Sequence, residues 1–217
     1  MSTKWSIRKI TDALAARLKA ESRRLDAEQA VRGIDSLDEL SLHPILAAGL
    51  NAAGFGVHRE QRYPSDRGCR RASEGERCDL VLTPGARPLD APDQPRTLFD
   101  PPDAVGLAVA FWLEVKVVAQ FTAAGPNRRY SAQLLGDVRH DVAKLAKDSG
   151  IRHAGLAIVL FTQNAAVADH DLEVWQQRSI ELALPIRPPC RTRIALADRL
   201  GNEHCTVATF PVGHIER

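Results

Sequence analysis

Three charged residues stand inside two apolar stretches of this chain, where packing alone would favour hydrocarbon side chains. Glu114 and Lys116 interrupt the run FWLEVKVV at residues 111 to 118, and Asp79 interrupts RCDLVLT at residues 77 to 83. Each run is typical of a buried strand. Moving a charged group out of water costs several kcal/mol unless it is paired or binds something. The positions of these three side chains therefore need a chemical explanation.

Strand geometry predicts which faces the charges occupy, because alternate side chains point to opposite sides of a sheet. Glu114 and Lys116 would share one face of their strand. On the other strand, Asp79 would share a face with Val81, whereas Cys78 would point the other way. If the two strands pair antiparallel, Asp79 comes opposite Glu114 and Lys116, and two carboxylates and an ammonium group converge.

Such a cluster predicts a metal site. Carboxylates placed close together repel and raise one another's pKa unless a cation lies between them. Mg²⁺ fits, because it is usually held by one or two carboxylates while waters and a phosphate complete its shell. A bound ion lowers the pKa of a water and neutralises charge on a phosphate, and a neighbouring lysine stabilises developing charge. These are the parts of a phosphodiester hydrolase.

The rest of the chain predicts the elements that would position these residues. The apolar periodicity favours an N-terminal amphipathic helix, a second helix with Ser36 as its N-cap and Gly54 as its stop, and a third helix before an internal strand. A proline-rich excursion follows the Asp79 strand and is predicted to lie on the surface. The expected helices span 7–31, 36–54, 130–148 and 167–184; the expected strands span 57–63, 77–83, 107–121 and 155–162, with a terminal hairpin around Gly201.

Asp79, the long excursion and Glu114-Val115-Lys116 on an apolar strand lie within the order helix, three strands, helix, strand. This arrangement resembles the PD-(D/E)xK nuclease superfamily with its restriction-endonuclease-like core. The resemblance covers residues 36 to 162, and residue 78 is Cys where the name-giving pattern has Pro. It implies an α/β fold of order αβββαβ, with a mixed central sheet flanked by helices.

The resemblance also implies roles for single residues. In the family the aspartate and the glutamate bind the metal ion, which carries over to Asp79 and Glu114, and the lysine assists catalysis, which carries over to Lys116. Many members add a glutamate from the first helix, and Glu39 is the best match, with His43 one turn later on the same side. The implied activity is that of a Mg²⁺-dependent DNA endonuclease, in which Mn²⁺ is expected to substitute.

The resemblance also divides the chain. Residues 1–35 would form a helical appendage, and residues 36–217 a nuclease-like domain. Within that domain, residues 36–162 would form the core, and residues 163–217 a C-terminal extension with a helix and a hairpin. Restriction, phage defence, repair and mobile-element processing all use this core, and the fold does not decide among them.

Polar residues after the Glu114 strand are candidates for substrate contacts. Gln120 is expected on the same strand face as Glu114 and Lys116. The start of the following helix would bring further side chains to the mouth of the site, where phosphate contacts are favourable. Solvent-facing polar residues at a strand end and a helix start explain the same pattern equally well. These further candidates are Arg128, Arg129, Tyr130 and Gln133.

The amino-acid composition says less about function, partners and location than the charged motif does. The chain has 44% hydrophobic and 26% charged residues and a net charge of +2, which suits a globular protein and gives little support for a polyanionic partner by itself. Aromatic residues make up only 5%, so contacts to phosphates are favoured over base stacking. No stretch of eighteen apolar residues exists, and we expect a cytoplasmic protein without a membrane partner.

Two alternatives remain open from the sequence. A non-catalytic module that retains the fold would bind nucleic acid or assemble with a protein, and an unrelated α/β interaction protein would use the N-terminal helix to bind its partner. Separately, the structural alternative to a metal site is that Glu114 and Lys116 form an ordinary salt pair on an exposed sheet face, with Asp79 capping a turn. A homodimer is a reasonable expectation if both strands of a duplex are cut.

Overall fold

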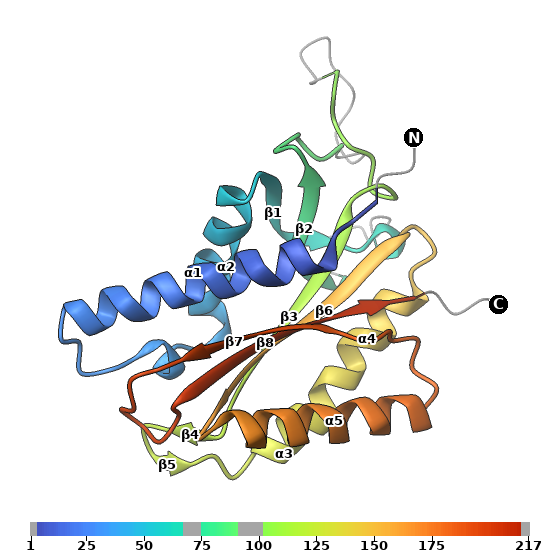
Figure 1. The fold of residues 1–217 in the computed structure, drawn as a ribbon. Helices are drawn as coiled ribbons and strands as arrows, with labels where there is room; N and C mark the ends of the chain where they lie inside the picture. Colours follow the sequence, from blue (N-terminus) through green and yellow to red (C-terminus); the bar gives the residue numbers. More distant parts are fainter. Residues whose placement is uncertain (1–3, 67–74, 91–101, 214–217) are drawn as a thin grey trace.

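A six-stranded mixed sheet lies between two layers of helices in the computed structural model, which describes residues 4–66, 75–90 and 102–213 (Figure 1). The strand order is β1-β2-β3-β6-β8-β7, and among the described strands of this sheet β3 and β6 form the one parallel pair. The strands are β1 (Phe55–Arg62), β2 (Arg77–Pro84), β3 (Phe111–Ala119), β6 (His153–Thr162), β7 (Cys190–Ala195) and β8 (His204–Val212).

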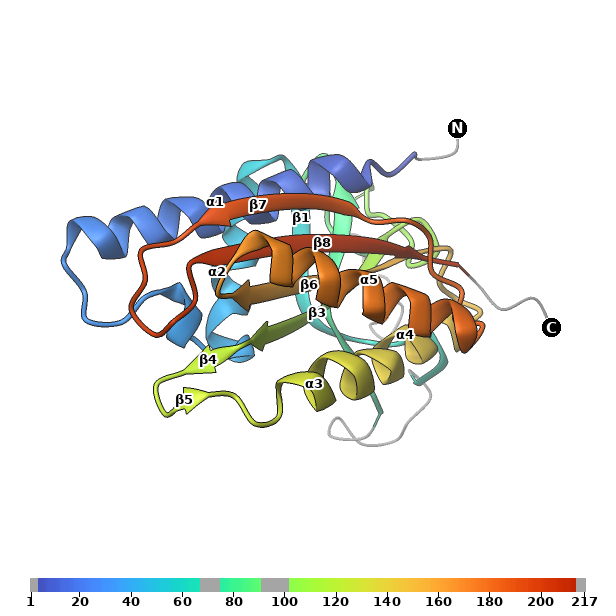
Figure 2. The ribbon, with the colours of Figure 1, turned by 60° about the horizontal axis from the view of Figure 1, so that its bottom comes forward.

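The helices cover opposite faces of the sheet, as Figures 1 and 2 show. One layer consists of α1 (Ile7–Ala27) and α2 (Glu39–Ala52). The other contains α4 (Val138–Lys147) and α5 (Ala165–Glu181). Short elements complete the order: η1 (Ile34–Ser36), η2 (Pro64–Asp66), the β4 (Phe121–Thr122) and β5 (Gly125–Pro126) pair, α3 (Tyr130–Ala132) and a π-helical turn, η3 (Gln133–Asp137).

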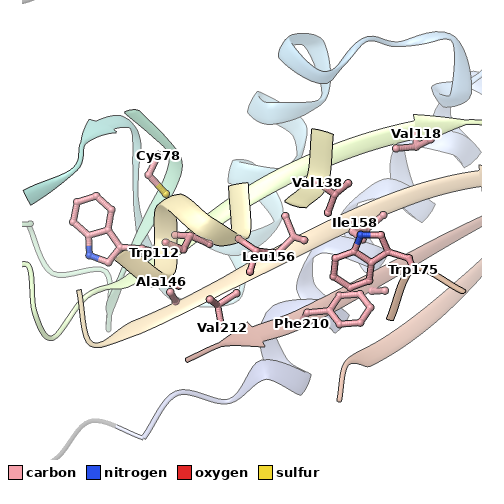
Figure 3. Close-up of a cluster of buried hydrophobic side chains, with 14 of the residues drawn as sticks. Cys78, Trp112, Val118, Val138, Ala146, Leu156, Ile158, Trp175, Phe210 and Val212 are labelled. Atoms are coloured by element: carbon pink, nitrogen blue, oxygen red, sulfur yellow. The ribbon is translucent and has the colours of Figure 1, made fainter. Parts of the chain in front are cut away.

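Each face of the sheet carries its own hydrophobic core. The core under α4 and α5 includes Trp112, Val138 and Trp175, whose ring lies 4.5 Å from that of Phe210, measured between centroids (Figure 3). The core under α1 and α2 includes the leucines of both helices. Nine of the ten residues of β6 are buried, because this strand is paired on both edges and covered on both faces.

The N-terminal helix contributes to the second core. Ile10, Leu14 and Leu18 are fully buried among residues of α2 and the sheet. The helix ends at Ala27, four residues before the predicted end, since Gln29 adopts a left-handed conformation with φ of 52°. The Gln29 N–H then bonds the Asp26 carbonyl and the Ala30 N–H bonds the Leu25 carbonyl, the pattern of a Schellman cap.

The N-cap of the second helix lies two residues after the predicted cap. Asp38 is the N-cap, and its Oδ1 accepts from the Ser41 N–H at 2.8 Å. Ser36 instead lies in η1 and donates its hydroxyl to the Gly33 carbonyl. The predicted stop at Gly54 is confirmed, because its φ of 86° is a conformation that favours glycine.

The sequence predicted the wrong side of the sheet for Cys78, which lies on the same strand as Asp79. Cys78 lies in the same core as Val81 and Trp112, on the α4 side of the sheet (Figure 3). The reason is a local irregularity: the pairs between β1 and β2 skip Glu60 and Asp79, and Glu60 has a φ of 52°. The alternation of side chains is therefore interrupted at Asp79, while Leu80 and Leu82 face the other core as expected.

The other predicted elements are found within a few residues of their expected positions. The strand at 57–63 is β1, the strand at 107–121 is the shorter β3, and the helix at 130–148 is built from α3, η3 and α4. The C-terminal helix and hairpin are α5 and the antiparallel pair β7–β8. Residues 91–101 of the proline-rich excursion lie outside the described residues.

Replacing Leu14 with Ala tests whether α1 is integral to the domain. We expect Leu14→Ala to lower the free energy of unfolding by about 3 kcal/mol, because it leaves a cavity in a core that closes over α1. Leu40→Ala is the control, since Leu40 is 68% exposed on α2. Urea unfolding of the variants measures both effects, and equal stabilities would show that α1 packs as a dispensable appendage.

Candidate functional site

The site forms where β2 and β3 separate. Their antiparallel pairing ends at Leu80 and Leu113, and continuing that register by one residue sets Asp79 opposite Glu114. Asp79 Oδ2 accepts a hydrogen bond from the Val115 N–H at 2.8 Å. The Asp79 side chain thus bonds a backbone N–H of β3 just beyond the last strand pair. The predicted antiparallel pairing of the two charged strands is confirmed.

Glu114 is a buried carboxylate, only 3% exposed. The Tyr63 hydroxyl donates a hydrogen bond to its Oε1, and the Lys144 ammonium lies 3.4 Å from the same oxygen. Burial, followed by the neighbouring Asp79 carboxylate, raises the pKa of Glu114 well above its usual value. In chemical terms, two carboxylates share a desolvated position and favour either a proton or a metal cation between them.

Lys116 is held by one carboxylate from each helical layer. Its Nζ lies 3.3 Å from Glu39 Oε2 on α2 and 3.5 Å from Asp141 Oδ2 on α4. Glu39 Oε2 also accepts from the Val117 N–H at 3.2 Å, so the start of α2 is tied to β3. Partial burial lowers the pKa of Lys116, but the two carboxylates outweigh it and the net shift is upward.

Asp141 and Lys144 extend the network along α4. The Lys144 ammonium lies 3.1 Å from Asp141 Oδ1, and both side chains are largely buried. Asp141 Oδ2 makes no hydrogen bond with a described residue, although Lys116 lies within ion-pair distance of it. The pKa of Lys144 is raised, because the carboxylates of Glu114 and Asp141 outweigh the effect of its burial.

The charges of this network leave room for a cation. With Glu114 protonated, three carboxylates face two ammonium groups; with Glu114 ionised, as in a metal complex, four carboxylates face two ammonium groups and two negative charges remain. A dication would balance them, and carboxylate oxygens are the ligands that Mg²⁺ prefers. The six groups are those of Asp79, Glu114, Glu39, Asp141, Lys116 and Lys144.

A second set of side chains could also hold a metal ion. His43, Glu60 and Asp79 each offer one ligand atom, and these atoms all lie within 4.8 Å of one another. Asp79 therefore belongs to both groups, with Glu114 in one and with His43 and Glu60 in the other.

A cleft of about 450 Å³ opens beside Lys116. It runs between the start of α2 and the segment that follows β3. Glu39 and Lys116 line this cleft, whereas Asp79 and Glu114 are not among its lining residues. Its lining includes Arg32, Asp38, Glu39, Lys116, Asn127 and Gln133.

Among the five predicted substrate contacts, Gln133 is the one that lines this cleft, where its Oε1 accepts from Asn127 at 2.9 Å. Gln120 turns to the β6–α5 loop and accepts from the Gln163 N–H. Tyr130 donates its hydroxyl to Asp171 on α5 at 2.7 Å. Arg128 and Arg129 are exposed and do not contribute to the cleft.

Sequence reasoning missed Tyr63, Asp141 and Lys144. A signal existed for Asp141, because it follows Val138 by three positions and precedes Leu145 by four, which places a carboxylate on the buried stripe of α4. Lys144 lies one turn from Asp141 on the same face. No comparable signal marks Tyr63, whose position follows from the path of the chain after β1.

No protein-family model, curated protein or solved structure matches the chain. None of the described helices is both long enough and apolar enough to cross a bilayer.

Lys144→Met tests whether Glu114 depends on its buried cation. We expect the free energy of unfolding at neutral pH to fall by about 2 kcal/mol, because the substitution leaves Glu114 and Asp141 with less compensation. Lys147→Met is the control, since Lys147 is exposed on the same helix. In the double variant Lys144→Met/Glu114→Gln much of the loss should be recovered. Denaturant unfolding of the unaltered protein, Lys144→Met, Glu114→Gln and the double variant measures this coupling. Additive effects would contradict the pairing.

Proposed function

We propose that the protein is a metal-dependent nuclease that hydrolyses phosphodiester bonds in DNA. The observation that carries the proposal is the convergence of Asp79 and Glu114, two carboxylates at the separation of β2 and β3, with Lys116 on the same strand. Two carboxylates this close favour a cation or a proton between them, and a lysine beside them suits an anionic substrate.

The topology agrees with a restriction-endonuclease-like core. The elements α2, β1, β2, β3, α4 and β6 follow the order helix, three strands, helix, strand, with β3 and β6 parallel. Asp79 and the Glu114-Val115-Lys116 segment occupy the second and third strands of that order, as in the PD-(D/E)xK pattern. The choice of DNA as the substrate rests on this resemblance.

Each residue of the site has a separate role in the proposed hydrolysis. Asp79 and Glu114 would hold a divalent ion, which when bound supplies Lewis-acid stabilisation and a water of lowered pKa. Lys116 keeps its proton and offers positive charge to the phosphate or to the attacking water. Glu39 and Asp141 position the Lys116 ammonium, and Lys144 and Tyr63 orient the Glu114 carboxylate.

Lys116→Met tests the catalytic assignment. Purified protein is incubated with linear, supercoiled or single-stranded DNA and Mg²⁺ or Mn²⁺, and cleavage is followed on gels. We expect the variant to cleave about 100-fold more slowly, because one preorganised positive charge is lost from the site. Lys147→Met, on the exposed face of α4, should cleave like the unaltered protein.

Two outcomes would contradict different parts of the proposal, the first the role of Lys116 and the second the cleavage itself. Equal metal-dependent cleavage by the unaltered protein and Lys116→Met would remove Lys116 from the mechanism. DNA binding without cleavage of any substrate would favour the alternative, a non-catalytic module that retains the fold.

Mg²⁺ should stabilise the folded protein through the same two carboxylates. A ligand that binds only the native state at 100 times its Kd adds about 2.7 kcal/mol, so thermal unfolding should shift upward with Mg²⁺. We expect Glu114→Gln to abolish this shift, because it removes one ligand and one of the two repelling charges. Glu173→Gln on α5 is the control, and an undiminished shift in Glu114→Gln would place the ion elsewhere.

A further inference from the structure

His43 is a buried histidine without hydrogen bonds. It lies on α2, one turn after Glu39, and is 1% exposed. Neither Nδ1 nor Nε2 has a hydrogen-bond partner among the described residues. A buried polar group left in this state costs about 1–3 kcal/mol. The interior therefore contains an imidazole ring whose two nitrogen atoms make no hydrogen bond with a described residue. Either nitrogen could bind a ligand.

Glu60 lies next to this ring in a backbone conformation that glutamate rarely adopts. Its φ of 52° falls inside strand β1, and the ladder to β2 omits it. Residues held in sparsely populated regions cost about 1–3 kcal/mol and are concentrated at binding and catalytic sites. The result of this conformation is that Glu60, His43 and Asp79 bring a carboxylate oxygen, a ring nitrogen and a second carboxylate oxygen within 4.8 Å of one another.

We propose that His43, Glu60 and Asp79 form a binding site for a first-row transition metal ion of the Zn²⁺ class. One imidazole and two carboxylates suit such an ion, whereas Mg²⁺ prefers oxygen ligands alone. Metal–ligand distances are about 2.1 Å, so Glu60, the exposed member of the three, is the ligand that would adjust to reach the ion. The two carboxylates match the charge of a dication.

The ion would connect three elements of the fold. His43 belongs to α2, Glu60 to β1 and Asp79 to β2, so binding links a helix of one layer to two strands at the edge of the sheet. A metal bond to one of the two His43 ring nitrogens would give that nitrogen a partner, and the same link would account for the strained Glu60 backbone. This site needs no cleavage activity, and it shares only Asp79 with the proposed nuclease site.

The test uses metal-free full-length protein titrated with Co²⁺, which serves as a spectroscopic probe for this class of ion. Calorimetry in buffer with excess Mg²⁺ should give one Co²⁺ per chain. Glu60→Gln should weaken binding at least tenfold, because even residues that only support metal ligands contribute about 10- to 100-fold to affinity. His43→Gln should weaken it similarly, and Glu173→Gln should bind like the unaltered protein.

Glu60 keeps the test informative even if His43→Gln fails to fold, because Glu60 is exposed and its substitution leaves both cores intact. Absence of Co²⁺ binding to the unaltered protein, or equal affinity in Glu60→Gln, would overturn the proposal. A near-ultraviolet charge-transfer band would show thiolate ligation at a cysteine and would overturn it as well.

Glu114→Gln separates this site from the proposed nuclease site. The variant should lose Mg²⁺-dependent stabilisation and cleavage and still bind Co²⁺ with an affinity within about threefold of the unaltered protein, since Glu114 is not a ligand of the second ion. Loss of Co²⁺ binding equal to that in Glu60→Gln would place the ion between Asp79 and Glu114 and overturn the second site. Failure to cleave DNA in every variant would leave the Co²⁺ result unaffected.

Discussion

The burial of the Glu114 carboxylate next to Asp79 is the constraint on which the arrangement around the site depends. An isolated carboxylate in a hydrophobic core is costly, and a second one beside it makes the position less favourable still. The surrounding structure offsets this cost with Tyr63 and Lys144, which contact Glu114, and with the Val115 N–H, which bonds Asp79. The pairing of β2 with β3 ends at Leu80 and Leu113, and just beyond this point the Asp79 side chain bonds the Val115 N–H.

The site draws on both helical layers because Lys116 lies near the end of β3. Glu39 reaches it from the first turn of α2 and Asp141 reaches it from α4, although the two helices pack on opposite faces of the sheet. Any displacement of either helix would alter the position of the ammonium group. The two hydrophobic cores therefore contribute to the geometry of the site as well as to stability.

Much of this fold follows from local patterns, and the parts that do not have identifiable reasons. The run GLAIVLFT predicts an internal strand because nearly all of its side chains are apolar, and β6 is such a strand. Alternation places Glu114 and Lys116 on one face, but it fails at Cys78, where the strand is distorted by its neighbour Glu60. The end of α1 depends on a left-handed glutamine, which no propensity scale favours.

The site was predictable to the extent that its residues lie on strands. Asp79 and Glu114 are placed by a register that two short apolar runs suffice to suggest. The directions of Gln120 and Tyr130 depend on hydrogen bonds to Gln163 and Asp171, residues more than forty positions away along the chain. Contacts of that kind form only when the layers of the fold pack together, so they cannot be predicted from the residues next to Gln120 and Tyr130 in the sequence.

The position of β8 has a consequence for how the chain folds. Although it follows β6 by about forty residues, β8 lies between β6 and β7 inside the sheet and pairs with both. Until residues 204–212 have left the ribosome, β6 has one unpaired edge and a nearly continuous apolar surface. Such an edge is a template for pairing with another chain. During synthesis the nascent protein is thus most prone to aggregation after β6 has emerged and before β8 has joined it.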